Sequence, residues 1–161
     1  MTFLEEVARA LVVAGRSVDL DPGLSTIDVS HGSGGRLLAV VRPVARAVTF
    51  YVVHPTFVPA GAVPAVTELL VRATADLLDA ALELDLATAA VATRFGVVLG
   101  ELDLTAEQLG ALLDAALETV EAAAARYAGA VDDVSGGAEP ATAASAVRRA
   151  DVEELAAGLD G

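Results

Sequence analysis

The chain has 161 residues, of which 55% are hydrophobic and 20% are charged, and it contains no cysteine. This composition predicts one soluble globular domain that needs no metal or disulfide to fold, and the missing cysteine excludes disulfides and thiolate chemistry. The formal net charge of −13 makes nucleic acids and anionic membrane surfaces poor partners, because their phosphate groups would be repelled.

The first element is expected to be a helix over residues 3–14. Thr2 and Glu5 form a capping box, apolar residues then recur at helical spacing, and Gly15 offers a left-handed exit. The acidic residues at the amino terminus do not fit a secretory signal, which carries basic residues there. A cytoplasmic location is therefore the expectation.

Three strands are expected next, as a meander. The segment 21–23 has the Asp-Pro-Gly chemistry of a turn, residues 31–35 are rich in glycine, and Pro43 interrupts the apolar run that follows. The uncharged stretch 47–67 contains three prolines, so it does not fit a single membrane helix. The expected strands are residues 24–30, 36–42 and 46–54.

A helix, two strands and a longer helix are expected in the second half. Pro64 suits the first turn of a helix, and residues 82–86 alternate between apolar and acidic side chains, as in a half-buried strand. Thr105 and Gln108 form a second capping box, followed by an apolar stripe that ends near Gly129. The expected elements are a helix at 64–80, strands at 82–86 and 90–99, and a helix at 105–129 whose stripe comprises Leu109, Leu112, Leu113, Ala116, Val120, Ala123 and Tyr127.

The composition changes after this helix. From Asp132 onward the chain is rich in glycine and alanine, which favours a flexible joint. We therefore expect residues 1–134 to form a single α+β domain and residues 135–161 to form a flexible tail. Asp151 and Glu154 could cap a short final helix within that tail.

Two segments carry a resemblance to a known family. Asp76-Leu77-Leu78-Asp79 ends a helix and leads into the alternating strand 82–86, and residues 100–105 (Gly-Glu-Leu-Asp-Leu-Thr) lead into Glu107-Gln108-Leu109. With this order of elements the chain resembles the YbjN family, whose domain is similar in fold to the type III secretion chaperones. One departure is Asp79, where the family often carries asparagine. The resemblance implies an antiparallel sheet of about five strands in the order α-β-β-β-α-β-β-α. It also implies a non-enzymatic module that contacts other proteins, often as a homodimer.

The sequence shows no catalytic or metal-binding motif. The glycine-rich loop at 31–35 leads into a strand rather than a helix, and the chain has no lysine, so the loop does not fit a phosphate cradle. His31 and His54 are the only imidazoles, and a metal site would have to recruit distant carboxylates. We expect no catalytic residues, no cofactor and no metal. Four clustered carboxylates lack calcium-loop spacing and are interpreted as solvated: Asp76, Asp79, Glu83 and Asp85.

Strands 36–42 and 46–54 are apolar on both faces. An antiparallel strand normally leaves one face polar, so this pair must be covered twice. Either the first helix covers one face and the other two helices the second face, or another protein chain covers one of them. Phe57, an aromatic among prolines, is a further candidate anchor. The residues expected to contact a partner are Leu38, Val40, Tyr51, Val53, Phe57 and Val58.

Three functions stay open from the sequence. The first is a chaperone-like or adaptor module that holds a protein client through apolar sheet and loop surface. The second is a two-fold homodimer with a structural or regulatory role and no client. The third is a small enzyme that combines His54 with scattered carboxylates such as Glu101 and Asp103.

Overall fold

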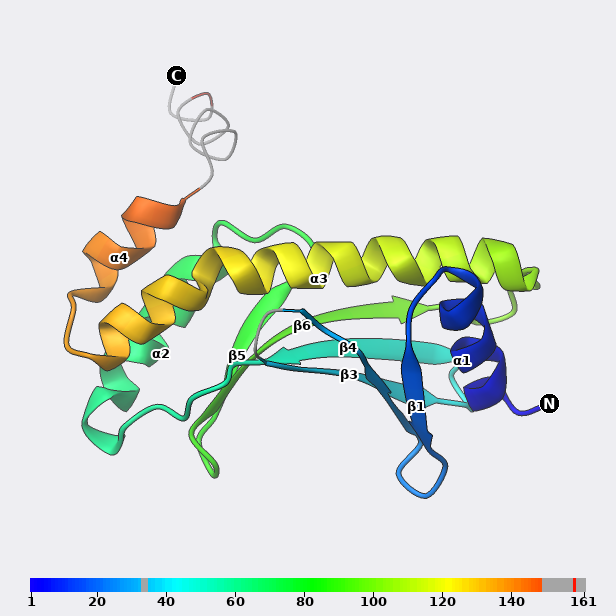
Figure 1. Cartoon of the computed structure of the whole chain (residues 1–161). Helices are drawn as coiled ribbons and strands as arrows, with labels where there is room; N and C mark the ends of the chain where they lie inside the picture. Colours follow the sequence, from blue (N-terminus) through cyan, green and yellow to red (C-terminus); the bar gives the residue numbers. More distant parts are fainter. Residues whose placement is uncertain (33–34, 149–157, 159–161) are drawn as a thin grey trace.

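The chain folds as a helix, four strands, a helix, two strands and two helices (Figure 1). The structure is a computed structural model that describes residues 1–32, 35–148 and 158. The helices are α1 (Phe3–Val13), α2 (Val63–Thr74), α3 (Ala106–Ser135) and α4 (Pro140–Val147), with a 3₁₀ turn, η1 (Ala60–Ala62), before α2. The strands are β1 (Val18–Asp21), β2 (Thr26–Val29), β3 (Arg36–Arg42), β4 (Ala47–Val53), β5 (Ala81–Asp85) and β6 (Ala90–Val98). Within these described ranges, no helix has both the length and the hydropathy that crossing a bilayer requires.

Helices α1 and α3 begin at the two capping boxes that the sequence predicts. The Glu5 amide donates to the Thr2 hydroxyl oxygen (3.3 Å), and the Glu5 carboxylate accepts from the Thr2 amide (2.7 Å). At α3 the Gln108 amide donates to the Thr105 hydroxyl oxygen (3.2 Å), and the Gln108 side-chain oxygen accepts from the Thr105 amide (3.0 Å). These bonds satisfy amide groups that the start of a helix leaves without partners.

The strands form one antiparallel sheet in the order β1-β2-β3-β4-β6-β5. The sheet has six strands rather than about five, because the sequence pattern does not predict β1. Asp19 and Asp21 make β1 a poor strand by propensity. Its other two side chains, Val18 and Leu20, pack against the core beneath α1, so their burial outweighs the propensity. The next strand begins at Thr26 rather than residue 24.

The ends of two helices differ from those expected. The helix expected over 64–80 ends at Thr74, and the chain turns there. The helix expected to end near Gly129 continues to Ser135, because Val131 and Val134 are buried and their packing outweighs the low helix propensity of glycine. Within its stripe Leu112 is 39% exposed, so it lies at the edge of the buried face.

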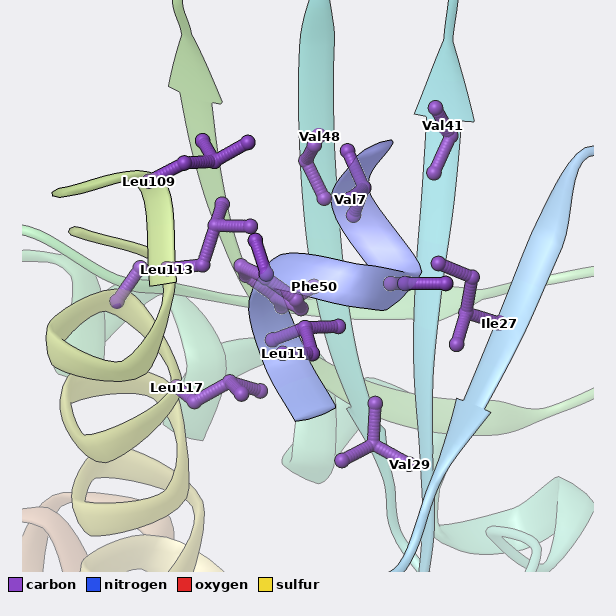
Figure 2. Close-up of a cluster of buried hydrophobic side chains, with 14 of the residues drawn as sticks. Val7, Leu11, Ile27, Val29, Val41, Val48, Phe50, Leu109, Leu113 and Leu117 are labelled. Carbon is purple, nitrogen blue, oxygen red and sulfur yellow. The ribbon is translucent and has the colours of Figure 1, made fainter. Parts of the chain in front are cut away.

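All the helices that pack on the sheet lie on one of its faces (Figure 1). One core cluster joins α1 and the first half of α3 to the inner side chains of β2, β3 and β4, with Phe50 near its centre (Figure 2). A second cluster joins α2 and the end of α3 to β5 and β6. The arrangement with α1 on one face and the other helices on the opposite face is therefore excluded.

Helix α4 lies in the segment that the sequence predicts to be a flexible tail. The Glu139 carboxylate caps it by accepting from the amides of Ala141 (3.0 Å) and Thr142 (2.6 Å). Val147 packs against the second cluster, and its carbonyl oxygen accepts from Arg126 Nε of α3 (2.7 Å). These contacts hold residues 140–147 on α2 and α3. The short helix expected near residues 151–154 lies outside the described residues.

Candidate functional site

The outer face is the side of the sheet opposite the helices. Strand register fixes its members, because residues paired across an antiparallel ladder share one face. Leu38 pairs with Tyr51 and Val40 pairs with Thr49, whereas the alternating residues, such as Phe50, point into the core. Within the described chain, none of the outer-face residues belongs to either core cluster. The described residues therefore place no covering layer on the outer face.

The middle of the outer face is apolar. Leu38, Val40, Tyr51 and Val53 are each partly exposed, and Val98 at one end is 69% exposed. Because single exposed apolar residues are common but a contiguous patch is not, such a patch marks a contact surface. We call this patch the apolar centre and define it by its residues: Leu38, Val40, Thr49, Tyr51, Val53, Ala92 and Val98.

Arginine side chains surround the apolar centre. Arg36 makes a bidentate ion pair with Asp28 (2.6 and 2.7 Å), and Arg94 pairs with Glu83 (3.0 Å). The hydrogen bonds from Arg36 lower the pKa of Asp28 below its ordinary value. Arg42 is exposed at the end of β3. The border strands β1 and β5 carry only acidic charges on this face, at Asp19, Asp21, Glu83 and Asp85. The outer face thus has a basic middle and acidic borders.

The structure brings four of the six expected partner-binding residues together and separates the other two from them. Leu38, Val40, Tyr51 and Val53 share the outer face. Phe57 is 70% exposed in the loop after β4. Val58 is only 4% exposed and belongs to the second core cluster, because its amide donates to the Ala89 carbonyl oxygen (2.8 Å) and holds the loop inward. Its side chain is therefore part of the core rather than of a contact surface.

The two histidines hold α3 against the sheet. Nε2 of His54, at the end of β4, lies 2.8 Å from a carboxylate oxygen of Asp132. Nδ1 of His31, in the loop after β2, lies 2.9 Å from a carboxylate oxygen of Glu121. The carboxylates expected to act with His54, Glu101 and Asp103, follow β6 at the opposite end of the sheet. His54 therefore does not meet Glu101 or Asp103, and its carboxylate partner is Asp132.

The cluster of four carboxylates divides in the structure. Asp85 lies in a turn, where the Ala87 amide and the Thr88 hydroxyl lower its pKa. Asp76, in contrast, is only 2% exposed, and its carboxylate accepts from the Tyr127 hydroxyl (2.6 Å) and from Arg126. The interpretation of Asp76 as a solvated charge is therefore wrong. Its partners lie 50 and 51 positions away in the sequence, so no local pattern could have revealed them.

Within the part of the chain that the structure describes, no three side chains of the metal-binding types come together to hold an ion. The apolar centre offers hydrophobic contact area and an aromatic side chain, and the surrounding arginines offer hydrogen bonds and charge, which are the components of a protein interface. Comparison of the chain with protein-family models, with curated proteins and with solved structures finds no match.

Proposed function

We propose that this protein is a non-catalytic binding module that forms a homodimer through its outer face. The observation that carries the proposal is the apolar centre, which no helix of the described chain covers. Burying such a patch against another surface contributes about 25 cal/mol for each Å² of apolar area removed from water, from which the entropic cost of association is subtracted. A second copy of the chain is the occupant that the size and charge of the face favour.

The size of the outer face suits a small two-fold interface. Six strands spaced about 4.8 Å apart, with central strands of seven to nine residues, give a face of roughly 600 Å². A standard specific interface buries about 800 Å² on each partner and the lower limit is about 500 Å², so this face lies between the two values. Packed sheets in proteins lie about 10 Å apart with interdigitating side chains, and the apolar centre offers side chains of this kind.

The charge pattern of the outer face also suits a second copy. The whole chain carries −13, so an association through most of its surface would bring like charges together. On the outer face Arg36 and Arg94 are already paired with acids of the same chain, whereas Arg42 makes no ion pair within the described residues. Asp19 and Asp21 on β1 make no ion pair there either. A two-fold interface is self-complementary, so Arg42 of one copy can pair with an acid on β1 of the other.

The resemblance to the YbjN family supports the same proposal, because that family is often homodimeric and similar in fold to type III secretion chaperones. Under this proposal the chain makes and breaks no covalent bond. A chaperone-like or adaptor role, in which a protein client occupies the outer face, is the competing outcome of the experiment below.

Sedimentation velocity over a wide concentration range tests the proposal. We expect the wild-type chain to sediment as a concentration-dependent dimer. Leu38→Lys should shift the equilibrium to monomer, because two lysines would be buried close together at the two-fold interface. Val71→Lys is the matched control, since Val71 is 68% exposed on α2, away from the outer face. This control should dimerise like the wild type.

A second substitution separates interface loss from misfolding. Val40→Lys should also yield monomer, and both variants should keep the circular dichroism spectrum of the wild type because their side chains lie outside the core clusters. A wild-type chain that stays monomeric at every concentration would overturn the homodimer. A dimer that both variants leave intact would place the contact elsewhere and overturn it too.

A further inference from the structure

We propose that the protein also binds a small uncharged apolar molecule in a cavity between α3 and the inner face of the sheet. The cavity has a volume of about 260 Å³ and lies where the two core clusters meet. Its walls include Val52, Leu82 and Val91 from the sheet and Ala124 and Ala128 from α3. Most of this lining lies on the helix side of the sheet, and Val53 at the end of β4 is the one member of the apolar centre that also borders the cavity.

The cavity exists because α3 carries alanine where it faces the middle of the sheet. Residues 122–125 are four consecutive alanines, and Ala128 follows one turn later on the same side of the helix as Ala124. Protein interiors are normally filled to the density of organic crystals, so larger side chains would be expected opposite Val52 and Val91. The small side chains leave a space that splits the core into two clusters.

The size of the cavity sets the size of its ligand. An apolar cavity of about 150 Å³ binds benzene, so about 260 Å³ accommodates a molecule of roughly ten non-hydrogen atoms. A pocket with mostly apolar walls and a few polar groups is the usual form of a small-molecule site. The polar side chains in these walls include Thr93, whose hydroxyl can form a hydrogen bond with one polar group of the ligand, whereas the rings of His31 and His54 already contact Glu121 and Asp132.

The charges near the cavity favour an uncharged ligand. Glu121 of α3 accepts from Arg16 (3.0 Å) and contacts His31, and Asp132 of α3 contacts His54. These two carboxylates therefore already have partners. These two contacts lie about 16 Å apart along the helix axis and flank the alanine segment. A charged ligand in this cavity would lie between apolar walls with no unpaired opposite charge beside it. Burying its charge there would carry a large desolvation penalty.

Calorimetric titration with three probes of equal chain length tests the ligand class. We expect 1-octanol to bind at one saturable site, and octanoate and octylammonium to bind at least about tenfold more weakly because of the charge they must bury. The absence of any saturable octanol binding would overturn the proposal. Tighter binding of octanoate or octylammonium than of octanol would overturn the assignment of an uncharged ligand.

Cavity-filling variants test the place of binding. Ala128→Leu and, separately, Ala124→Leu should weaken octanol binding by about tenfold or more, because the added side chain occupies the ligand space. Ala115→Leu is the matched control on the exposed side of α3 and should bind octanol like the wild type. Leu38→Lys should also retain octanol binding, which separates this site from the outer face. Unchanged binding in both folded cavity variants would overturn the site.

Discussion

The Tyr127 hydroxyl of α3 donates to the buried carboxylate of Asp76, 2.6 Å away, just after the end of α2. Arg126 bonds the same carboxylate oxygen and uses its Nε to hold the Val147 carbonyl oxygen of α4. One carboxylate thus connects the end of α2 to α3, and through Arg126 to α4. Because Asp76 and Tyr127 are only 2% and 1% exposed, neither group can exchange this partner for water.

Asp76→Ala should be strongly destabilising. Removing the carboxylate leaves the Tyr127 hydroxyl buried without an acceptor and Arg126 without its ion pair, and breaking such a buried pair typically costs about 3–5 kcal/mol. Asp79→Ala removes an exposed carboxylate three residues later and should change stability by less than about 0.5 kcal/mol. Urea denaturation measures both values. Similar midpoints for the two variants would contradict the structural role of Asp76.

The stability of the wild type should fall at alkaline pH through Tyr127. Burial, together with the hydrogen bond to Asp76, raises the pKa of Tyr127 above its ordinary value of 10.0. Above pH 10 the unfolded chain loses this proton while the folded chain keeps it, so the free energy of unfolding decreases as pH rises. This contribution is fully present below pH 10.

The variant Tyr127→Phe isolates that effect. It lacks the titrating hydroxyl, so its free energy of unfolding should decrease less steeply above pH 10 than that of the wild type. Urea denaturation at several alkaline pH values gives both slopes. Parallel slopes would show that Tyr127 is not the group responsible.

Two glycines of α3 should respond oppositely to alanine. A Cβ at Gly110 would lie 2.6 Å from the Ala10 carbonyl oxygen, so Gly110→Ala should push α1 away from α3 and destabilise the fold by about 1–3 kcal/mol. A Cβ at Gly129 meets no atom within 4 Å, so Gly129→Ala should stabilise the helix by about 0.5–1 kcal/mol. Thermal unfolding of the two variants checks the signs. A stabilised Gly110→Ala variant would contradict the close approach of the helices.

The cap at Glu139 should control the order of α4. Hydrogen bonds from the side chain and amide of Thr142, and from the Ala141 amide, lower the pKa of Glu139 below 4.5. As pH falls, Glu139 becomes protonated at a higher pH in the unfolded segment than in the folded one. The cap therefore stabilises α4 fully above pH 4.5, and this stabilisation is lost as pH falls through the lowered pKa. The Cα chemical shifts of residues 140–147 should move toward coil values over this acidic range.

Substitution tests the same cap at neutral pH. Glu139→Ala should accelerate amide hydrogen exchange across residues 140–147 while exchange in α3 is unchanged, because only the cap of α4 is lost. Glu118→Ala, at an exposed position of α3, is the control and should leave exchange in α4 as in the wild type. Equal exchange in the two variants would show that packing alone holds α4.

The sequence by itself determined the features that a few neighbouring residues encode. The capping boxes at Thr2 and Thr105 fixed two helix starts, and strand 36–42 has the predicted bounds. Period-two geometry also placed Leu38 and Val40 on one face of their strand and Tyr51 and Val53 on one face of theirs, because side-chain direction within a strand depends only on sequence parity. The register that brings Leu38 opposite Tyr51 came from the structure.

Only the tertiary structure decided which face of the sheet the helices cover, and that Asp76 is buried rather than solvated. It also decided that β1 joins the sheet, that Val58 lies in the core and that three alanines of α3 line a cavity. Each of these depends on contacts between segments far apart in the chain, whose burial outweighs local propensity. Packing against α1 and α3 determines which face of the apolar pair β3 and β4 is buried in the core. The strands themselves carry no local mark of that choice.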